Sequence, residues 1–100
     1  MAVIRLLKVR GNSLSPDFCE GDYVLTLRVP FPAGKVNVGD VITFTQPGYG
    51  TLIKRVRRIL ADGRKFDVRG RLSDSTDSRD FGPIAPEQIT GKVIWHIKGN

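Results

Sequence analysis

Apolar and polar residues alternate with a period of two along most of the chain, and turn-forming residues interrupt the alternation at short intervals. This pattern is typical of short strands with one buried face, and no longer stretch has the 3.6-residue apolar spacing of an amphipathic helix. The predicted strands are Val3 to Val9, Asp22 to Arg28, Asp40 to Thr45, Thr51 to Leu60, Lys65 to Arg69 and Thr90 to Ile97. The sequence therefore predicts a mostly β protein.

Two connections between these strands are long, at residues 29–39 and 70–88. Loops of this length in a small domain are often functional. Within the second, Ala85 to Gln88 has a proline near its start and predicts one short helical turn. We expect no more than one such turn in the chain.

The chain has 100 residues, which predicts a single domain spanning residues 1–100. Lysine and arginine outnumber aspartate and glutamate by 16 to 10, and the net charge of +6 suits nucleic acid, an anionic membrane surface or an acidic substrate. A single cysteine excludes an internal disulfide, and one cysteine with one histidine cannot form a structural zinc site. We expect no metal and no cofactor.

The apolar run from Ala2 to Leu7 contains an arginine and is much shorter than the roughly 20 residues of a membrane-spanning helix. Met1 leads directly into it, without the three regions of a secretory signal. We expect a soluble, cytoplasmic protein if Met1 is the native start, and a membrane-associated one if an upstream anchor was removed.

A compact polar turn follows the first predicted strand, with the sequence Gly-Asn-Ser-Leu-Ser-Pro from Gly11 to Pro16. Gly11 permits close backbone approach and Pro16 fixes the direction in which the chain leaves. Such a turn could present the Ser13 hydroxyl to a substrate carbonyl. Taken alone, however, this motif is also typical of an ordinary surface turn.

A serine nucleophile needs a base, and the only histidine, His96, lies in the last strand, where a structural role is expected. Strand alternation places Lys54 among aliphatic side chains, on the same face as Leu52 and Val56. Burial and the neighbouring cations at positions 55, 57 and 58 would both lower the lysine pKa and allow it to accept a proton. The alternative is a solvated basic edge strand.

Four sequence blocks, in order, resemble the boxes of the signal peptidase family, whose fold is shared with the self-cleaving repressor peptidases. The first block joins Gly11–Pro16 to Gly21-Asp22-Tyr23-Val24, and the others are Gly39 to Phe44, Ile53 to Val56 and Ser75 to Ile84. Together they run from residue 11 to residue 84. The resemblance implies a small catalytic core of coiled antiparallel β-sheets.

The same resemblance implies a role for each matching residue. Ser13 is the nucleophile, its main-chain N–H contributes to an oxyanion hole, and Lys54 is the general base. Ser75 orients the lysine amine, while Asp77 and Arg79 pair beneath the site and hold that loop. The family cleaves leader or signal peptides from precursor proteins, so a precursor bound as an extended strand is the expected partner.

Three observations refine this resemblance. Leu14 stands where the family usually has methionine, and Gly70-Arg71-Leu72 replaces Gly-Asp-Asn. The run from Ser75 to Gly82 is similar to that of the proteases that remove the leader of nickel-type superoxide dismutase. A substrate strand is expected beside Leu6 to Val9 and Thr51 to Lys54. The predicted substrate-binding side chains are Leu6, Val9, Leu14 and Leu52.

Two other classes of function remain open. The chain could be a peptide-binding module that keeps the fold without turnover, to which the changes at Leu14 and Gly70–Leu72 would point. It could also bind nucleic acid or an anionic surface through the basic run from Lys54 to Arg58. No aromatic residue lies between Tyr49 and Phe66 to stack on bases, so we expect no nucleic-acid partner. The oligomeric state is not predicted.

Overall fold

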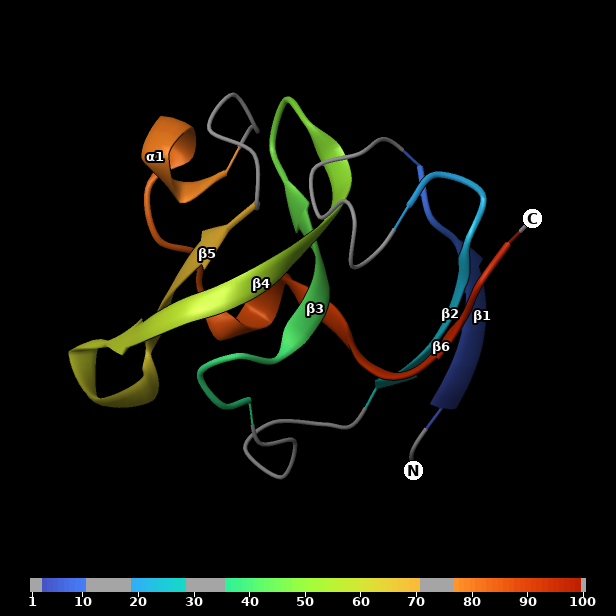
Figure 1. Cartoon of the computed structure of the whole chain (residues 1–100). Coiled ribbons are helices and arrows are strands. Elements are labelled where there is room, and N and C mark those ends of the chain that lie inside the picture. Colours follow the sequence, from blue (N-terminus) through green and yellow to red (C-terminus); the bar gives the residue numbers. More distant parts are fainter. Residues whose placement is uncertain (1–2, 11–18, 29–35, 71–76, 100) are drawn as a thin grey trace.

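The computed structural model describes residues 3–10, 19–28, 36–70 and 77–99, and within these it shows one antiparallel sheet of six strands (Figure 1). The strands are β1 (Val3–Lys8), β2 (Tyr23–Arg28), β3 (Val41–Gln46), β4 (Gly50–Leu60), β5 (Lys65–Arg69) and β6 (Ile89–Ile97). The predicted mostly β class is confirmed, and each predicted strand is present with its ends displaced by no more than one residue.

The strands lie in the order β1-β2-β6-β3-β4-β5, so the last strand in the sequence occupies the middle of the sheet. One part of β6 pairs with β2, as at Leu25 and Trp95, and the other pairs with β3, as at Thr43 and Gly91, with Lys92 paired on both sides. In Figure 1 the sheet bends between these two parts, with β1 and β2 on the right and β4 and β5 on the left. Irregular register in the β2–β6, β3–β6 and β4–β5 pairs accompanies this coiling.

Two hydrophobic clusters lie on opposite faces of the bent sheet. The larger contains Ile42, Phe44, Val56, Phe66, Val68 and Ile84. The smaller contains Val9, Val24 and Val41. Four consecutive residues of β3, from Val41 to Phe44, are buried, because successive side chains of a strand point to opposite faces and both faces of β3 are covered. The strand β3 therefore forms the centre of the fold.

Three short helical turns connect the strands: η1 (Ala61–Gly63), α1 (Ser78–Phe81) and η2 (Pro86–Gln88). The last is the turn predicted at Ala85 to Gln88, formed here as a 3-10 turn. The α1 turn lies in the connection that was predicted to be a loop. None of the helices among the described residues is long and apolar enough to cross a membrane.

His96 has the structural role expected from the sequence. Its Nε2 shares a hydrogen bond of 2.7 Å with Oδ2 of Asp22, whose carboxylate also accepts the main-chain N–H groups of Cys19 and Gly99. These two N–H bonds and the His96 bond lower the pKa of Asp22 to about 2. The carboxylate thereby ties the end of β6 to the segment that leads into β2.

Candidate active site

Lys54 lies on β4, directly opposite Ile42 of β3. Its side chain is on the face of β4 that packs into the larger core cluster, between Leu52 and Val56. Only 4% of Lys54 is exposed. The strand alternation that places aliphatic side chains on both sides of this lysine therefore also carries it out of solvent.

The ammonium group of Lys54 has no hydrogen bond or ion pair within the described part of the chain. Burial disfavours the charged form and is the main cause that lowers the pKa of Lys54 below its ordinary 10.5. The carboxylate of Asp77 opposes this shift, the guanidinium of Arg79 adds to it, and the Asp80 carboxylate opposes it. The net effect is a lowered pKa, which makes the neutral amine, the form that can accept a proton, easier to reach.

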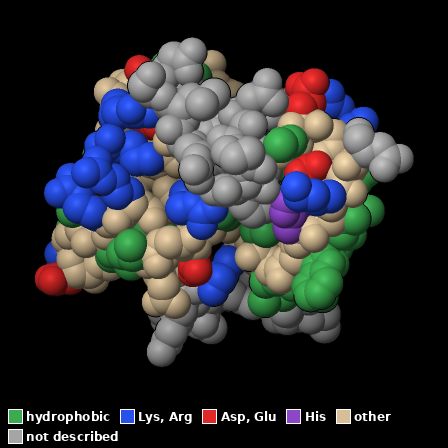
Figure 2. All heavy atoms as spheres, viewed as in Figure 1, with side chains coloured by type: hydrophobic (Ala, Val, Ile, Leu, Met, Phe, Trp, Pro, Cys, Tyr) green, Lys and Arg blue, Asp and Glu red, His purple; other side chains and the backbone are tan. Residues whose placement is uncertain are grey.

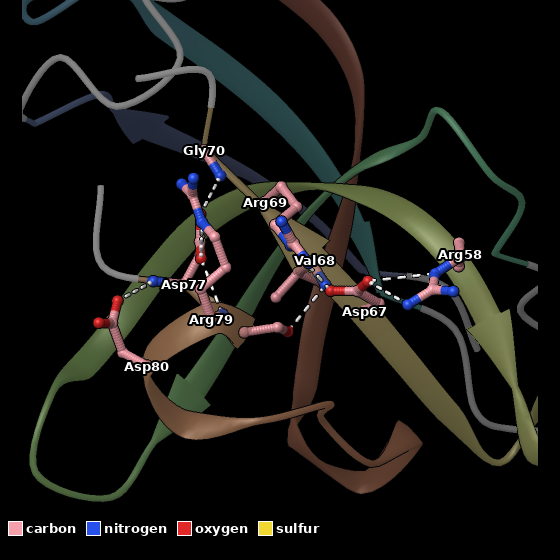
Figure 3. Close-up of polar contacts among 9 residues, drawn as sticks. Arg58, Asp67, Val68, Arg69, Gly70, Asp77, Arg79 and Asp80 are labelled. Atoms are coloured by element: carbon pink, nitrogen blue, oxygen red, sulfur yellow. Dashed lines mark hydrogen bonds and ion pairs between the residues drawn. The ribbon is translucent and has the colours of Figure 1, made fainter. Parts of the chain in front are cut away.

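The carboxylate of Asp77 is fully buried and binds Arg79 through two hydrogen bonds, of 3.0 Å from Nε and 2.7 Å from a terminal nitrogen (Figure 3). It also accepts the main-chain N–H groups of Arg79 and Gly70. Burial alone would raise the pKa of Asp77, but the hydrogen bonds from Arg79 and Gly70 outweigh it and lower the pKa to about 2. Asp77 is therefore a fixed negative charge near Lys54.

The short helix α1 is attached to the end of β5, and this attachment brings Asp77 to Lys54. The Val68 N–H donates to Oγ of Ser78 at 2.9 Å, and the Gly70 N–H donates to Asp77 at 2.8 Å. Since Arg69 of β5 lies opposite Arg55 of β4, the end of β5 is next to the position of Lys54. The Asp77 carboxylate is thus held near enough to the buried amine for its charge to act on the Lys54 pKa.

The capping arrangement of α1 explains why this helix forms. Asp77 is its N-cap and accepts the Arg79 N–H, while the Asp80 side chain accepts the Asp77 N–H at 3.0 Å. Such reciprocal bonds satisfy two main-chain donors at a helix start. The spacing of the two aspartates, three residues apart, is the sequence signal that could have predicted this turn. No sequence signal predicted that Ser78 would accept a hydrogen bond from β5.

Four of the predicted site residues, Gly11, Ser13, Leu14 and Ser75, lie outside the described residues. Lys54, Asp77 and Arg79 are described and lie together.

The predicted substrate-binding side chains on the strands differ in exposure. Leu6 on β1 is 58% exposed, and Leu52 on β4 is half-buried beside the larger core cluster. Val9 is only 4% exposed and belongs to the smaller core cluster. Val9 therefore packs in the core, and among the predicted substrate-binding residues that the structure describes, Leu6 and Leu52 have exposed surface.

The cation that acts on Lys54 differs from the expectation. The sequence predicted that Arg55, Arg57 and Arg58 would lower its pKa, whereas the cation that does so is Arg79. Adjacent residues of a strand point away from one another, so the arginines of β4 lie mostly on the other face. A residue 25 positions later in the sequence supplies the charge because α1 returns to this face of the sheet.

No curated protein matches the chain closely. The family model described as "Signal peptidase, peptidase S26" matches residues 1–63, which is more than half of the chain. The matched stretch contains Ser13 and Lys54 and ends before Asp77. The mostly β fold agrees with the one that the resemblance implied, and the match indicates a signal-peptidase-like function. The chain belongs to the signal peptidase family, peptidase S26.

Proposed function

We propose that the protein is a serine endopeptidase that removes a leader or signal peptide from a precursor, with Ser13 as the nucleophile and Lys54 as the general base. The observation that carries this proposal is the state of Lys54. Its side chain is buried, its amine has no hydrogen bond or ion pair within the described residues, and its pKa is lowered. A lysine whose pKa is lowered in this way suits proton abstraction from a serine hydroxyl.

The reaction has two stages. In the first, Lys54 Nζ takes the proton of the Ser13 hydroxyl while its oxygen attacks the scissile carbonyl, and the main-chain N–H of Ser13 stabilises the oxyanion. The protonated lysine then gives its proton to the leaving amine, and an acyl-enzyme remains. In the second, Lys54 takes a proton from water, the resulting hydroxide attacks the ester, and the proton returns to the Ser13 oxygen.

The Asp77–Arg79 pair would act by position. It holds the start of α1 against the end of β5, with its carboxylate and guanidinium exerting opposite effects on the Lys54 pKa. Removing either partner would move the remaining charge and alter the proton affinity of the amine. Ser75 would orient that amine, as the family resemblance implies.

The substrate would bind as an added strand. β3 covers one side of β4 from Gly50 to Arg55, while β5 covers the other side only from Arg55 to Leu60. Within the described residues, no strand pairs with Gly50 to Lys54 on that second side. A precursor lying there would run past Leu52 to Lys54. The leader of a nickel-type superoxide dismutase is the specific substrate that the Ser75–Gly82 run suggests.

The test is co-expression of the chain with a candidate precursor, followed by intact mass measurement of the product. We expect the wild-type protein to cleave and both Ser13→Ala and Lys54→Met to stop cleavage while remaining folded by circular dichroism. Lys98→Met, a change of the same kind at an exposed position, is the matched control and should cleave normally. Cleavage by Ser13→Ala or Lys54→Met at the wild-type rate would refute the proposed mechanism, and no cleavage of any precursor by wild type would favour a silent binding module.

A further inference from the structure

The paired strands β4 and β5, with the turn η1 between them, carry most of the net positive charge of the chain. Residues 55–69 contain six basic and two acidic residues, a net +4 of the +6 carried by the whole chain. The basic residues are Arg55, Arg57, Arg58, Arg64, Lys65 and Arg69. We call this region the basic ribbon. Figure 2 shows a dense group of blue side chains on the left, where Figure 1 places β4 and β5.

Register decides which face of the ribbon carries this charge. Val56 lies opposite Val68 and Ile59 opposite Phe66, and three of these four side chains are in the larger core cluster. The opposite face therefore carries the pairs Arg55 with Arg69, Arg58 with Asp67, and Leu60 with Lys65. One face of the ribbon is packed against the core, and the other is basic.

Within the described residues, two of the cations on this face pair with one carboxylate. Asp67 is nearly buried and forms ion pairs with both Arg58, at 3.4 Å, and Arg69, at 3.1 Å (Figure 3). Arg55 and Arg69 lie directly opposite each other, an arrangement that costs stability for like charges. Arg57 is the extra residue at a register shift, is exposed, and has no ion pair within the described part of the chain.

The proposed substrate path leads to this face. β5 pairs with the same side of β4 from Arg55 to Leu60, so a chain bound along Gly50 to Lys54 would lie in line with β5. It cannot continue in the plane of the sheet, so it must leave over one face of the ribbon. Because the other face is packed into the core, the chain passes over the basic face and meets Arg55 and Arg69 first.

We propose that the basic ribbon is a docking surface for an acidic segment of the precursor, a few residues to one side of the cleaved bond. The inference rests on the proposed function for its substrate and deepens it by naming the charge that the substrate carries. Guanidinium groups bind carboxylates through paired N–H donors. An acidic peptide is favoured over nucleic acid because the ribbon has no exposed aromatic side chain for base stacking.

The experiment measures binding of labelled peptides by fluorescence polarisation, using Ser13→Ala to prevent turnover. The peptides come in pairs, and every peptide has small residues before the cut. In the first pair, four residues on one side of the cut are Asp and Glu in one peptide and the matching Asn and Gln in the other. A second pair places these residues on the other side. We expect one of the two acidic peptides to bind about tenfold more tightly than its amide partner at low salt, the effect of two exposed ion pairs. In 0.5 M NaCl the preference should nearly disappear.

Two double variants with the same change in net charge separate the ribbon from general attraction. Arg57→Glu with Lys65→Glu changes the ribbon, whereas Arg28→Glu with Lys98→Glu changes exposed positions on β2 and after β6. We expect the first to abolish the acidic preference and the second to retain most of it. Both are checked for folding by thermal melting.

Three results would overturn the inference: no acidic preference in either pair, equal loss in both double variants, or tighter binding of single-stranded DNA or phosphatidylserine vesicles that depends on the ribbon. The last would reassign the surface to nucleic acid or membrane. The binding assay does not depend on cleavage, so it tests the docking surface independently of the proposed protease activity. If wild type cuts neither the acidic nor the amide peptide while the ribbon-dependent preference holds, the docking surface stands and the protease assignment is wrong.

Discussion

Replacing Lys54 by methionine should abolish cleavage and at the same time stabilise the fold. Methionine has a similar length and no ionisable group, so it fills the space between Leu52 and Val56 without burying an amine. Replacing buried ion pairs by well-packed apolar side chains of similar volume is often neutral or stabilising by about 1–4 kcal/mol, and an unpaired buried amine has no partner to offset its desolvation. We expect a gain of about 2 kcal/mol at pH 7, or roughly 8–16 °C in Tm for a domain of this size.

The pH dependence of this gain identifies its cause. The unfolded chain binds a proton at Lys54 up to pH 10.5, whereas the folded chain releases it at lower pH because the pKa is lowered. Wild-type stability therefore rises with pH between the folded pKa and 10.5, and each unit of lowering is worth about 1.4 kcal/mol. The advantage of Lys54→Met should shrink through this window and vanish above it.

The assay is urea denaturation of wild type, Lys54→Met and Lys98→Met at several values of pH from 6 to 10.5. Differences between variants cancel the titration of the other groups. Lys98 is exposed, so its variant should stay within about 0.5 kcal/mol of wild type throughout. A Lys54→Met variant that is less stable than wild type at pH 7, or whose advantage does not change with pH, would show that the amine is charged and paired and would refute the reasoning.

Three further predictions concern the fold that supports the site. Phe44→Ala should lower the free energy of unfolding by about 3–5 kcal/mol in urea denaturation, because the ring is fully buried. Trp95→Ala should change it little, because Trp95 is exposed. Equal losses in the two variants would show that Phe44 is not in the core. Gly91→Ala should destabilise by about 1–3 kcal/mol, since its Cβ would lie 3.0 Å from a neighbouring side-chain carbon, and a neutral result would show that the strands can shift. Asp22 and Asp77 have a folded pKa of about 2 against 3.8, so their contribution to stability is complete above pH 3.8 and is lost as the pH falls to about 2. A urea midpoint that stays constant from pH 5 to pH 2.5 would contradict this.

The candidate site was only partly predictable from local sequence. Lys54 could be chosen because its neighbours at positions 52 and 56 are aliphatic and a strand places all three on one face. The positive charge that acts on it was assigned to Arg55, Arg57 and Arg58 because they are close in sequence, but it comes from Arg79. Distance in sequence is a poor guide to distance in space once a loop returns to the sheet.

Val9 and α1 show the same limit. Val9 continues an alternating strand and could face either solvent or core, and only the packing of β2 and β3 against it determines that it is buried. The α1 helix is four residues long, too short to show an apolar period, and it depends on its cap and on bonds to β5. Its presence is a consequence of tertiary contacts more than of helix propensity.

The sequence by itself determined the strands, their ends and the mostly β class, because alternation and turn residues act over a few neighbouring positions. It also carried the ordered boxes by which the family could be identified. The tertiary structure decided that β6 lies between β2 and β3, that Lys54 is removed from solvent and that Asp77 and Arg79 lie beside it. These features depend on contacts between residues far apart in the chain, which no local pattern encodes.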